Sequence, residues 1–303
     1  AAAIPASCRA TVMGELSFIR RTLPSSSQPV KATIATSDKT GYSSRPMMET
    51  ASPPKGDRIA KIMARAGLCS RREAERWIEA GRVSVAGKVL DSPAFNVADP
   101  ATVLVDGKPL PAAASTRLWR YHKPPGVVTT ERDPEGRPTV FDRLPSGLPR
   151  VMTIGRLDIA SEGLLLLTND GALKRHLELP ATGWTRRYRV RVYGRVEAGK
   201  LASLAGGITV DGMRYGAIQA TLERQEGANA WIAIGLREGK NREIRKVMDH
   251  LGYSVNRLIR TAYGPFQLGG LKRNAVEESP GKVVRDQLGK KLAARFDFAN
   301  RRR

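Results

Sequence analysis

Apolar residues recur with a regular period only from about residue 57 of this 303-residue chain. The first of them follow the i, i+3, i+4, i+7 spacing of an amphipathic helix: Ile59, Ile62, Met63 and Ala66. Asp57 can cap this helix and Gly67 can end it. The pattern therefore predicts a short helix between these two residues.

A second helix and a hairpin are predicted directly afterwards. Ser70-Arg71-Arg72-Glu73 has the S-x-x-E form of a capping box, and the helix that follows should stop at Gly81. Its expected buried positions are Ala74, Trp77 and Ile78. The alternating run 83–85 then meets a turn at Gly87 and returns through Val89. Residues 57–104 are thus predicted to form a small domain of two helices and a hairpin, on the edge of independent stability.

A larger α+β domain is predicted for residues 117–286, after a linker at 105–116 that is rich in proline and small residues. In one expected strand the residues alternate strictly, with Tyr188, Val190 and Val192 on one face and Arg187, Arg189 and Arg191 on the other. Helical spacing appears further on, in Ile244, Val247, Met248 and Leu251. Residues 287–303 form a basic stretch that is expected to be a solvated tail.

Residues 1–56 show no steady periodicity and are rich in Ser, Thr, Pro and Ala, which is typical of disorder. The stretch is poor in acids and contains Arg9, Arg20 and Arg21, so a cleaved transit peptide is one interpretation. The other is a flexible or over-extended start, with Met47 or Met48 as the initiator. The lack of a clear cleavage pattern favours the second interpretation.

Charge indicates the class of partner. The chain has 51 Lys and Arg residues against 29 Asp and Glu residues, a net charge of +22. Such an excess costs the folded state in self-repulsion unless a polyanion relieves it, and nucleic acid is the usual polyanion. No apolar stretch is long enough to span a bilayer, and no helix has the broad aromatic face of a membrane-surface helix. A membrane partner is therefore not expected.

The cysteine and histidine residues indicate neither disulfides nor metal. The two cysteines are far apart in sequence, and the three histidines lack metal-ligand spacing: Cys8, Cys69, His122, His176 and His250. We therefore expect a protein of the reducing cytoplasm whose chemistry runs without a metal.

The two predicted helices at 57–81 are strongly basic on their polar positions: Arg58, Lys61, Arg65, Arg71, Arg72 and Arg76. A solvated surface explains any one of these cations equally well, but six on two short helices exceed what solubility needs. The segment 58–87 resembles an S4 domain, an RNA-binding module of ribosomal proteins and RNA-modifying enzymes. This resemblance implies a set of RNA-facing residues: Arg58, Lys61, Ser70, Arg71, Arg72, Arg76 and Arg82.

Candidate chemistry gathers in the run Gly155-Arg156-Leu157-Asp158, which precedes Ser161-Glu162-Gly163 and an apolar strand. A polar loop before a buried strand is a common way for a fold to present reactive groups at a cleft. Taken alone, however, an arginine two residues before an aspartate is more often a surface pair. The four-residue run by itself is therefore a weak signal.

The run gains weight because it resembles the catalytic motif of RsuA/RluB-type ribosomal RNA pseudouridine synthases. Three further segments resemble that family in the same order: 123–128 (K-P-P-G-V-V), 186–194 and 235–247. With the S4 domain, the resemblance covers nearly everything from 57 to 278. His122 stands where many relatives have Asn, and Arg187 stands where an acid or Lys often precedes the Tyr. These departures bear on which RNA is recognised.

The resemblance implies a reaction that needs no cofactor, because isomerising uridine to pseudouridine breaks the N1–C1′ bond and joins C5 to C1′ without oxidation or hydrolysis. Asp158 would be the catalytic carboxylate, acting as nucleophile or as base at the sugar. Arg245 would lie beside it, where a guanidinium favours the charged carboxylate. Tyr188, a core aromatic by pattern alone, would stack on the flipped base.

Further substrate contacts are implied around this set. Ile244 would line the uracil pocket, and Arg156 would hold the flipped nucleotide or its phosphate. Asn241 and Arg242, in the 235–247 segment, are also expected to bind substrate.

The sequence thus predicts a monomeric α+β enzyme that forms pseudouridine in ribosomal RNA or in a ribosome assembly intermediate. The resemblance is closer to the large-subunit (23S) branch, partly through the run L-L-L-L-T-N-D-G and the basic tail. A 16S rRNA substrate is one alternative, and a non-catalytic S4-containing RNA-binding or ribosome-assembly protein is the other. A pure binder would have no need of Asp158 beside Arg245 and Tyr188.

Overall fold

The N-terminal part of the described chain folds around an apolar core contributed by two helices and a small sheet. The computed structural model describes residues 56–298, so the disorder expected for residues 1–55 lies outside the described part of the chain. The elements of the first part are β1 (Asp57–Arg58), α1 (Ile59–Arg65), α2 (Arg71–Glu79), β2 (Val83–Val85), β3 (Lys88–Val89), β4 (Asn96–Val97), η1 (Pro100–Thr102), β5 (Val103–Val105) and β6 (Lys108–Pro109). The core includes Ile59, Met63, Ala74, Ile78 and Val83.

The predicted capping box of α2 is confirmed. The Ser70 hydroxyl accepts a hydrogen bond from the Glu73 main-chain N–H, and the Glu73 carboxylate accepts one from the Ser70 N–H. The predicted cap of α1 is wrong, because Asp57 lies in β1 opposite Val97. The first turn of α1 is satisfied by strand-like pairing instead, since the Ile59 N–H donates to the Phe95 carbonyl.

The predicted hairpin is part of a four-stranded antiparallel sheet in the order β3-β2-β5-β6. Its last strand, β6, lies within residues 105–116, which the sequence analysis treats as linker. Leu110 also packs against the core of this part of the chain. The S4-like segment therefore continues to at least residue 110 in its contacts.

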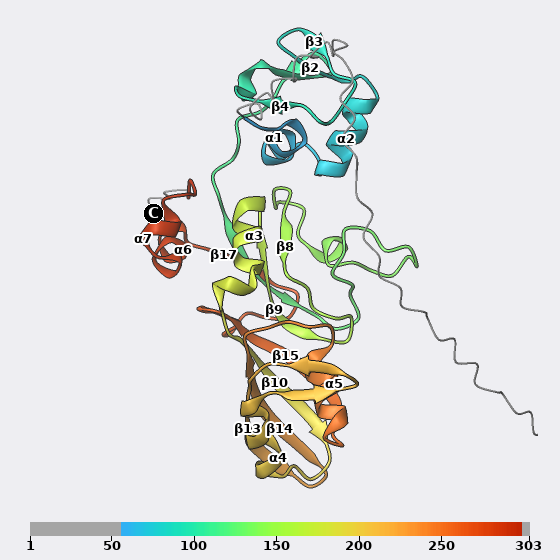
Figure 1. Ribbon diagram of the computed structural model, residues 1–303, viewed down its shortest axis with the longest axis vertical. Helices are drawn as coiled ribbons and strands as arrows, with labels where there is room; N and C mark the ends of the chain where they lie inside the picture. The colour runs from blue at the N-terminus through green and yellow to red at the C-terminus, as the bar shows by residue number, and fades with distance from the viewer. Residues whose placement is uncertain (1–55, 299–303) are drawn as a thin grey trace, which may run out of the picture. The chain divides into compact units, whose positions relative to one another are not determined.

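A nine-stranded sheet organises the rest of the chain, as the α+β prediction expected (Figure 1). Its main path is β13-β14-β10-β15-β9-β7-β17, with β16 on β15 and β8 on β9. These strands are β7 (Leu118–Lys123), β8 (Met152–Ile154), β9 (Glu162–Thr168), β10 (Arg186–Tyr193), β13 (Ile218–Glu226), β14 (Asn229–Leu236), β15 (Ser254–Tyr263), β16 (Phe266–Gln267) and β17 (Val276–Ser279). The other elements are η2 (Phe141–Arg143), α3 (Gly171–Glu178), η3 (Pro180–Thr182), α4 (Ala198–Ser203), η4 (Leu204–Gly206), β11 (Ile208–Val210), β12 (Met213–Tyr215), α5 (Glu243–His250), α6 (Gly281–Leu288) and α7 (Lys290–Ala293).

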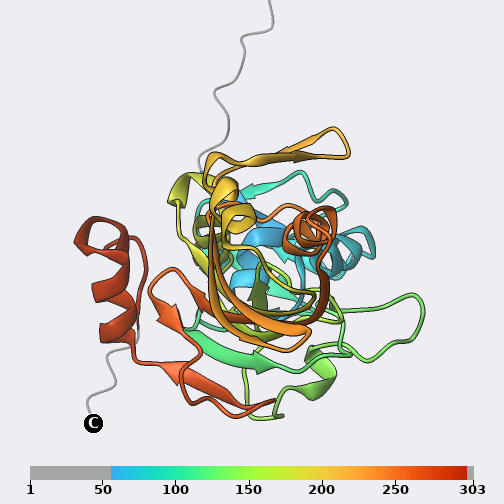
Figure 2. The ribbon, with the colours of Figure 1, turned by 90° about the horizontal axis from the view of Figure 1, so that it is seen from below.

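The sheet has two parts that differ in how they are covered. Every residue of β9 is buried, because core clusters lie on both of its faces, and this explains its unbroken run of four leucines. The strands β10, β13 and β14 bury only one face, against α4, α5 and their neighbours. Figure 2 shows α5 lying inside the curve of these strands. The alternation predicted for 187–192 is confirmed, with Val190 and Val192 buried and the arginines exposed.

The two parts of the sheet join through a short parallel pairing of β15 with β9, in which Ile259 pairs with Glu162 and Arg260 with Gly163. Gly163 has φ +107°, and a Cβ atom there would lie 2.3 Å from the Arg260 carbonyl oxygen. Only glycine allows this approach of the two strands without a shift of the main chain.

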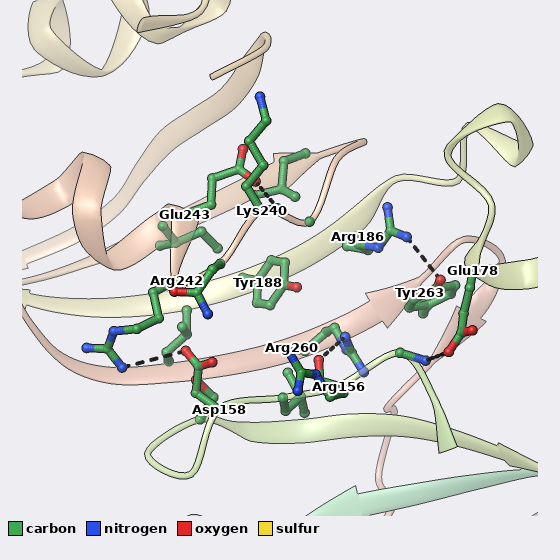
Figure 3. Close-up of a pocket in the computed structure, with 18 of the residues that line it drawn as sticks. Arg156, Asp158, Glu178, Arg186, Tyr188, Lys240, Arg242, Glu243, Arg260 and Tyr263 are labelled. Atoms are coloured by element: carbon green, nitrogen blue, oxygen red, sulfur yellow. Dashed lines mark hydrogen bonds and ion pairs between the residues drawn. The ribbon is translucent and has the colours of Figure 1, made fainter. Parts of the chain in front are cut away.

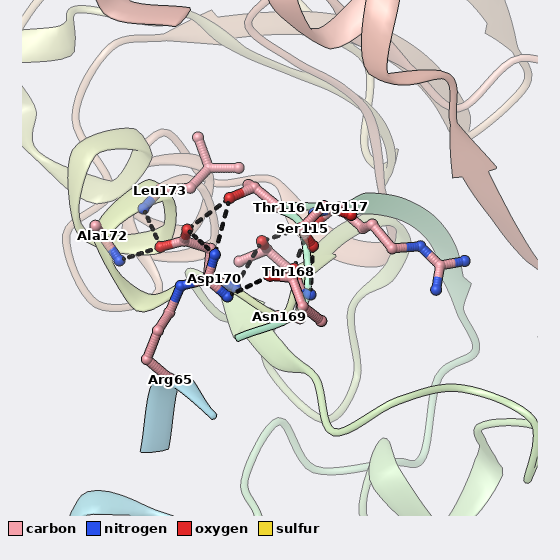
Figure 4. Close-up of polar contacts among 10 residues, drawn as sticks. Arg65, Ser115, Thr116, Arg117, Thr168, Asn169, Asp170, Ala172 and Leu173 are labelled. Carbon is pink, nitrogen blue, oxygen red and sulfur yellow. Dashed lines mark hydrogen bonds and ion pairs between the residues drawn. The ribbon is translucent and has the colours of Figure 1, made fainter. Parts of the chain in front are cut away.

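The run T-N-D-G, which connects the end of β9 to the start of α3, has a structural role (Figure 4). Asn169 accepts a hydrogen bond from the Arg117 N–H and donates one to the Ser115 carbonyl. Asp170 caps α3 and accepts a 2.7 Å hydrogen bond from the Thr116 hydroxyl. The same carboxylate forms an ion pair of 3.4 Å with Arg65 at the end of α1. These contacts fix the entry of the chain into β7.

The C-terminal segment differs from the solvated tail that the sequence predicts. Ala293 and Phe298 are buried and pack in one cluster with Leu118 and Val284. Thr116 forms an isolated bridge with Phe298. A few apolar residues within the basic stretch are therefore enough to dock it on the end of the sheet.

Candidate active site

A cleft of about 470 Å³ opens where the loop 155–161, β10, β15 and the segment 236–244 meet (Figure 3). Six of the residues predicted for the site line it: Arg156, Asp158, Tyr188, Asn241, Arg242 and Ile244. Figure 3 shows Asp158 on the loop and Tyr188 on the facing strand β10. Segments more than eighty residues apart in sequence therefore contribute to one cavity, as the motif order suggested.

Asp158 has a cationic partner, but it is not the one that the sequence predicts. Arg242 Nη1 lies 3.8 Å from Asp158 Oδ2, and the two side chains are 48% and 32% exposed. Arg242 precedes α5 and has φ +51°, an unusual conformation for a residue with a Cβ atom. The bend before α5 thus directs this guanidinium toward the carboxylate, at a cost in main-chain strain.

Arg245, which was expected beside Asp158, does not line the cleft. Its guanidinium donates to two main-chain carbonyls, that of Val255 at 3.1 Å and that of Ala160 at 3.2 Å. Ala160 lies two residues after Asp158 in the same loop. Arg245 therefore contacts the loop that carries the carboxylate, and Arg242 supplies the ion pair.

The start of this loop is held by two polar side chains from other segments. Glu178, at the end of α3, accepts a 2.6 Å hydrogen bond from the Gly155 N–H. The buried Thr129 hydroxyl donates to the Leu157 carbonyl at 2.8 Å and accepts from the Leu157 N–H at 3.3 Å. The main chain on the N-terminal side of Asp158 is therefore fixed from both sides.

Lys123 holds the other side of the loop. Its side chain is fully buried, and its ammonium group donates to the carbonyls of Pro124, Asp158 and Ser161 at 3.0, 3.2 and 2.9 Å. Burial lowers the pKa of Lys123 to about 8, so the group is still largely charged at neutral pH. A buried ammonium with three carbonyl acceptors is a strong local constraint on the main chain.

Arg260 completes the support of the loop from β15. It is 2% exposed and donates to the Leu164 carbonyl at 2.7 Å and the Arg156 carbonyl at 3.4 Å. With Lys123, Thr129 and Arg245, it leaves the loop little freedom to move its main chain. A carboxylate on such a loop is positioned before any substrate arrives, which is a property of catalytic groups.

Tyr188 lies where it can be both a core aromatic and a ring that stacks on a base, the two interpretations from the sequence. It is half-buried and packs against two core clusters, and it also lines the cleft. Arg260 lies opposite it on β15. One side of the ring is therefore packed while another faces the cavity, as stacking on a planar base requires.

A second aromatic residue, Tyr263, lines the end of the cleft away from Asp158. Arg186 donates to the Tyr263 hydroxyl at 3.1 Å, and its guanidinium lies 4.9 Å from the centre of that ring. The Tyr263 hydroxyl in turn donates to the Leu177 carbonyl. This end of the cavity is thus cationic and firmly held.

Glu243 lines the cleft at the first turn of α5 and is 4% exposed. Burial raises the pKa of Glu243 to about 7, and the neighbouring Glu238 carboxylate adds to the rise. Glu243 accepts a 3.0 Å hydrogen bond from the Lys240 N–H, which closes the bend that carries Arg242. Its protonation state therefore bears on the geometry next to Asp158.

The predicted RNA-facing residues of the S4-like segment fall into two groups. Arg58, Arg71, Arg72 and Arg76 are exposed. Ser70 and Arg82 have structural contacts: Ser70 caps α2, and the Arg82 guanidinium, which is also exposed, pairs with Asp106 over the Trp77 ring. Lys61, 44% exposed, forms an ion pair with Asp57.

Several residues of the site were not found by sequence reasoning: Lys123, Thr129, Lys174, Glu178, Arg186, Arg260 and Tyr263. Lys123 lies in the K-P-x-G segment that resembles the family, and this was a signal without an assigned role. Arg186 begins the family-like segment 186–194 but had no assigned role. The others contact residues far away in the sequence, such as Thr129 with Leu157 and Arg260 with Arg156, and a local pattern does not reveal such contacts.

The fold matches that of a solved pseudouridylate synthase. A crystal structure of a pseudouridylate synthase aligns with 77% of this chain and 100% of its own, with a TM-score of 0.54 and 23% sequence identity. Family models describe residues 117–250 as RNA pseudouridylate synthase and residues 57–100 as an S4 domain.

Sequence relatives give the family directly. An RNA pseudouridine synthase of Rickettsia bellii is 46% identical over 75% of this chain and 99% of its own length. Ribosomal large subunit pseudouridine synthase B of Yersinia pestis is 40% identical over 74% of this chain and 72% of its own, and that of Haemophilus influenzae is 40% identical over 77% and 68%. This chain belongs to the RNA pseudouridine synthases, and it is an isomerase with an S4 RNA-binding domain.

Within residues 56–298 no group of three or more His, Cys, Asp or Glu side chains is arranged to hold a metal ion. In the same range no helix has the length and apolar character needed to cross a bilayer.

Proposed function

We propose that this protein converts a uridine of large-subunit (23S) ribosomal RNA into pseudouridine, with Asp158 as the catalytic carboxylate. The proposal rests on one observation above all. Asp158 projects into a cleft from a loop whose main chain is held by four buried or half-buried side chains, with Arg242 at 3.8 Å and Tyr188 across the cavity.

Asp158 would act at the sugar, as a nucleophile on C1′ or as a base, so that the N1–C1′ bond breaks. The detached uracil turns, C5 joins C1′, and the proton leaves C5 while N1 gains one, so that no atom is added or lost. Arg242 places a positive charge 3.8 Å from the carboxylate in a partly enclosed site. No bound cofactor is needed for this balance.

Tyr188 and the cationic walls would hold the flipped nucleotide. Reaching the target atoms requires that the uridine leave its stack, and an aromatic ring replaces part of the lost stacking. Arg156 and Arg186 line the cleft and would contact phosphates beside the flipped base. Ile244 would contribute the apolar side of the uracil pocket.

The large-subunit assignment is supported by relatives from two organisms that are named ribosomal large subunit pseudouridine synthase B. Small-subunit (16S) rRNA is the alternative substrate. The same catalytic residues would act on a uridine of either RNA, because residues outside this set would select the RNA. The S4 domain would dock on folded rRNA through Arg58, Arg71, Arg72 and Arg76, which are exposed.

Carbodiimide treatment followed by primer extension tests the proposal, because pseudouridine retains the adduct and stops the polymerase. Ribosomal RNA from a strain that lacks this gene should lose one primer-extension stop in 23S rRNA, and the wild-type gene should restore that stop. Asp158→Asn should fail to restore the stop while the protein accumulates normally. A restored stop with Asp158→Asn refutes the catalytic assignment, and a stop lost from 16S rRNA refutes the choice of substrate.

A further inference from the structure

The exposed face of strand β10 carries arginine at three successive outward positions, Arg187, Arg189 and Arg191. Their side chains lie on the face opposite to Tyr188, Val190 and Val192, which pack on the core or line the cleft. We name as the arginine face the exposed residues Arg187, Arg189, Arg191 and Arg257 together with the half-buried Trp231, on β10, β14 and β15 (Figure 1).

This arrangement does not serve the stability of the sheet. Arg191 pairs directly with Arg257 of β15, and like charges directly opposite one another on a sheet destabilise it. Along β10 the three arginines follow one another at a spacing of about 7 Å. Such a concentration of one charge costs free energy in the folded protein, and a bound polyanion would relieve that cost.

Carboxylates neutralise only part of the face. Arg189 pairs with Glu223, and Arg257 shares Glu162 with Arg273. The four arginines of the face thus meet two carboxylates, one of which is shared with Arg273 outside the face. The side chains of Arg187 and Arg191 form no hydrogen bond or ion pair with any residue in the range 56–298.

Aromatic rings lie among these cations. Trp231 is directly opposite Arg191, and the Arg189 guanidinium lies 4.6 Å from the centre of its ring. Tyr193, the next outward residue of β10, is 58% exposed. Guanidinium groups interleaved with aromatic rings suit a nucleic-acid backbone with unstacked bases better than they suit an acidic protein surface.

The arginine face is separate from the catalytic cleft, although both use β10. Arg186 and Tyr188 line the cleft, and the intervening Arg187 and the following Arg189 point the other way. Because successive side chains of a strand alternate between the two faces, a short RNA in the cleft does not reach the arginine face.

We propose that the arginine face binds the phosphate backbone of a second segment of the substrate RNA, distinct from the segment that carries the target uridine. The proposal rests on the proposed function in that it takes ribosomal RNA as the substrate, and it adds a docking surface on the back of the catalytic sheet. This surface would act together with the S4 domain, so that the enzyme holds a folded RNA from more than one side.

The test compares two RNAs and a double variant, Arg187→Gln/Arg191→Gln. Binding of full-length transcribed 23S rRNA should weaken roughly tenfold, and the slope of log K against log salt concentration should fall by about 1 to 2, since each lost phosphate contact removes a little under one. Binding of a short single-stranded uridine-containing RNA, which fills only the cleft, should not change. The matched control is Arg143→Gln/Arg175→Gln, two exposed arginines elsewhere in the domain, and it should leave both affinities close to the wild-type values.

A second variant guards against loss of folding. Arg187→Lys/Arg191→Lys keeps the charges and should bind 23S rRNA within a few-fold of wild type with an unchanged salt slope. Unchanged binding by the glutamine variant refutes the proposal and leaves the face to a protein partner. An equal loss with the short RNA, with the control variant or with the lysine variant refutes it as well.

Failure of this proposal and failure of the proposed function are distinguishable. The binding measurements require no turnover and can be made in an Asp158→Asn background. If 23S rRNA contains no uridine that the enzyme modifies, the proposed function fails, while a selective loss of long-RNA binding still supports the arginine face.

Discussion

The ammonium group of Lys123 donates a 3.2 Å hydrogen bond to the main-chain carbonyl of Asp158, and it does so from a fully buried position. The same group donates to the carbonyls of Pro124 and Ser161, so one side chain fixes three points around the loop that carries Asp158. The carboxylate is thus positioned through its own main chain rather than through its side chain.

Replacing this group should affect turnover more than binding. Lys123→Met fills the same space without the three donors, and we expect kcat to fall about 100-fold because the loop no longer fixes the carboxylate within an ångström. KM for RNA should change little, since Lys123 does not line the cleft. Single-turnover and steady-state kinetics measure the two effects, with Lys282→Met, an exposed site, as the control. A rise in KM at constant kcat would contradict the positioning role.

The two arginines near Asp158 should respond differently to lysine. Arg245 uses two nitrogens to reach the carbonyls of Val255 and Ala160, which a single ammonium group does not span. Arg242 acts as a point charge at 3.8 Å from the carboxylate. We expect Arg245→Lys to lower kcat at least tenfold and Arg242→Lys to stay within about threefold of wild type. The opposite ranking of kcat would show that Arg245, not Arg242, is the ionic partner in the complex.

Glu243 should make stability depend on pH near neutrality. Burial raises the pKa of Glu243 from 4.5 to about 7, so the folded protein binds this proton more tightly than the unfolded chain does. The group therefore favours folding below pH 4.5, and this contribution is lost as the pH rises through 7. Glu243→Gln should be more stable than wild type at pH 8 by up to about 3 kcal/mol, a difference that shrinks toward pH 5.

Thermal unfolding of both proteins between pH 5 and pH 8 measures this difference. Glu79→Gln, at an exposed position of α2, serves as the control and should follow the wild-type curve. If the wild-type and Glu243→Gln melting temperatures stay parallel across this range, the carboxyl group does not titrate there.

The close approach of β9 and β15 predicts a severe effect of one methyl group. In Gly163→Ala the new Cβ atom would lie 2.3 Å from the Arg260 carbonyl oxygen, at a φ of +107°. We expect a loss of at least about 3 kcal/mol in the free energy of unfolding, because backbone rather than a flexible side chain must move. Gly199→Ala in α4 meets nothing within 4 Å and should stabilise by up to about 1 kcal/mol. Denaturant titration of both variants measures the contrast, and a Gly163→Ala protein of wild-type stability would contradict the structure at this pairing.

Local periodicity carried most of what could be predicted from the sequence. The period of two at Tyr188, Val190 and Val192 and the helical spacing at Ile244, Val247 and Met248 are fixed by neighbours in the chain, and both are confirmed. The capping box at Ser70 is equally local. The parts of the fold that the pattern missed, such as the pairing of Asp57 with Val97, depend on residues far apart in sequence.

The site shows the same division. Motif resemblance led to Asp158, Tyr188 and Arg242, which line the cleft. It gave no role to Lys123 or Arg260, whose contacts to the loop span 35 and 104 residues and leave no periodic trace in the sequence. It also placed Arg245 beside the carboxylate. Asp158 does interact electrostatically with Arg245, but Arg242 forms the ion pair, and a motif does not tell which of two arginines, three positions apart, forms it.

The parallel pairing of β9 with β15 also determines when the active site exists during folding. The loop that carries Asp158 and the Lys123 side chain belong to one side of this pairing, and Tyr188 and Arg242 belong to the other. Within the sheet, two residue pairs, each about a hundred positions apart in the chain, join the sides. Contacts of such long range form slowly because a large loop must close first. Recovery of enzymatic activity on refolding therefore reports the formation of the β9–β15 pairing, after the residues on each side have formed their own strands and helices.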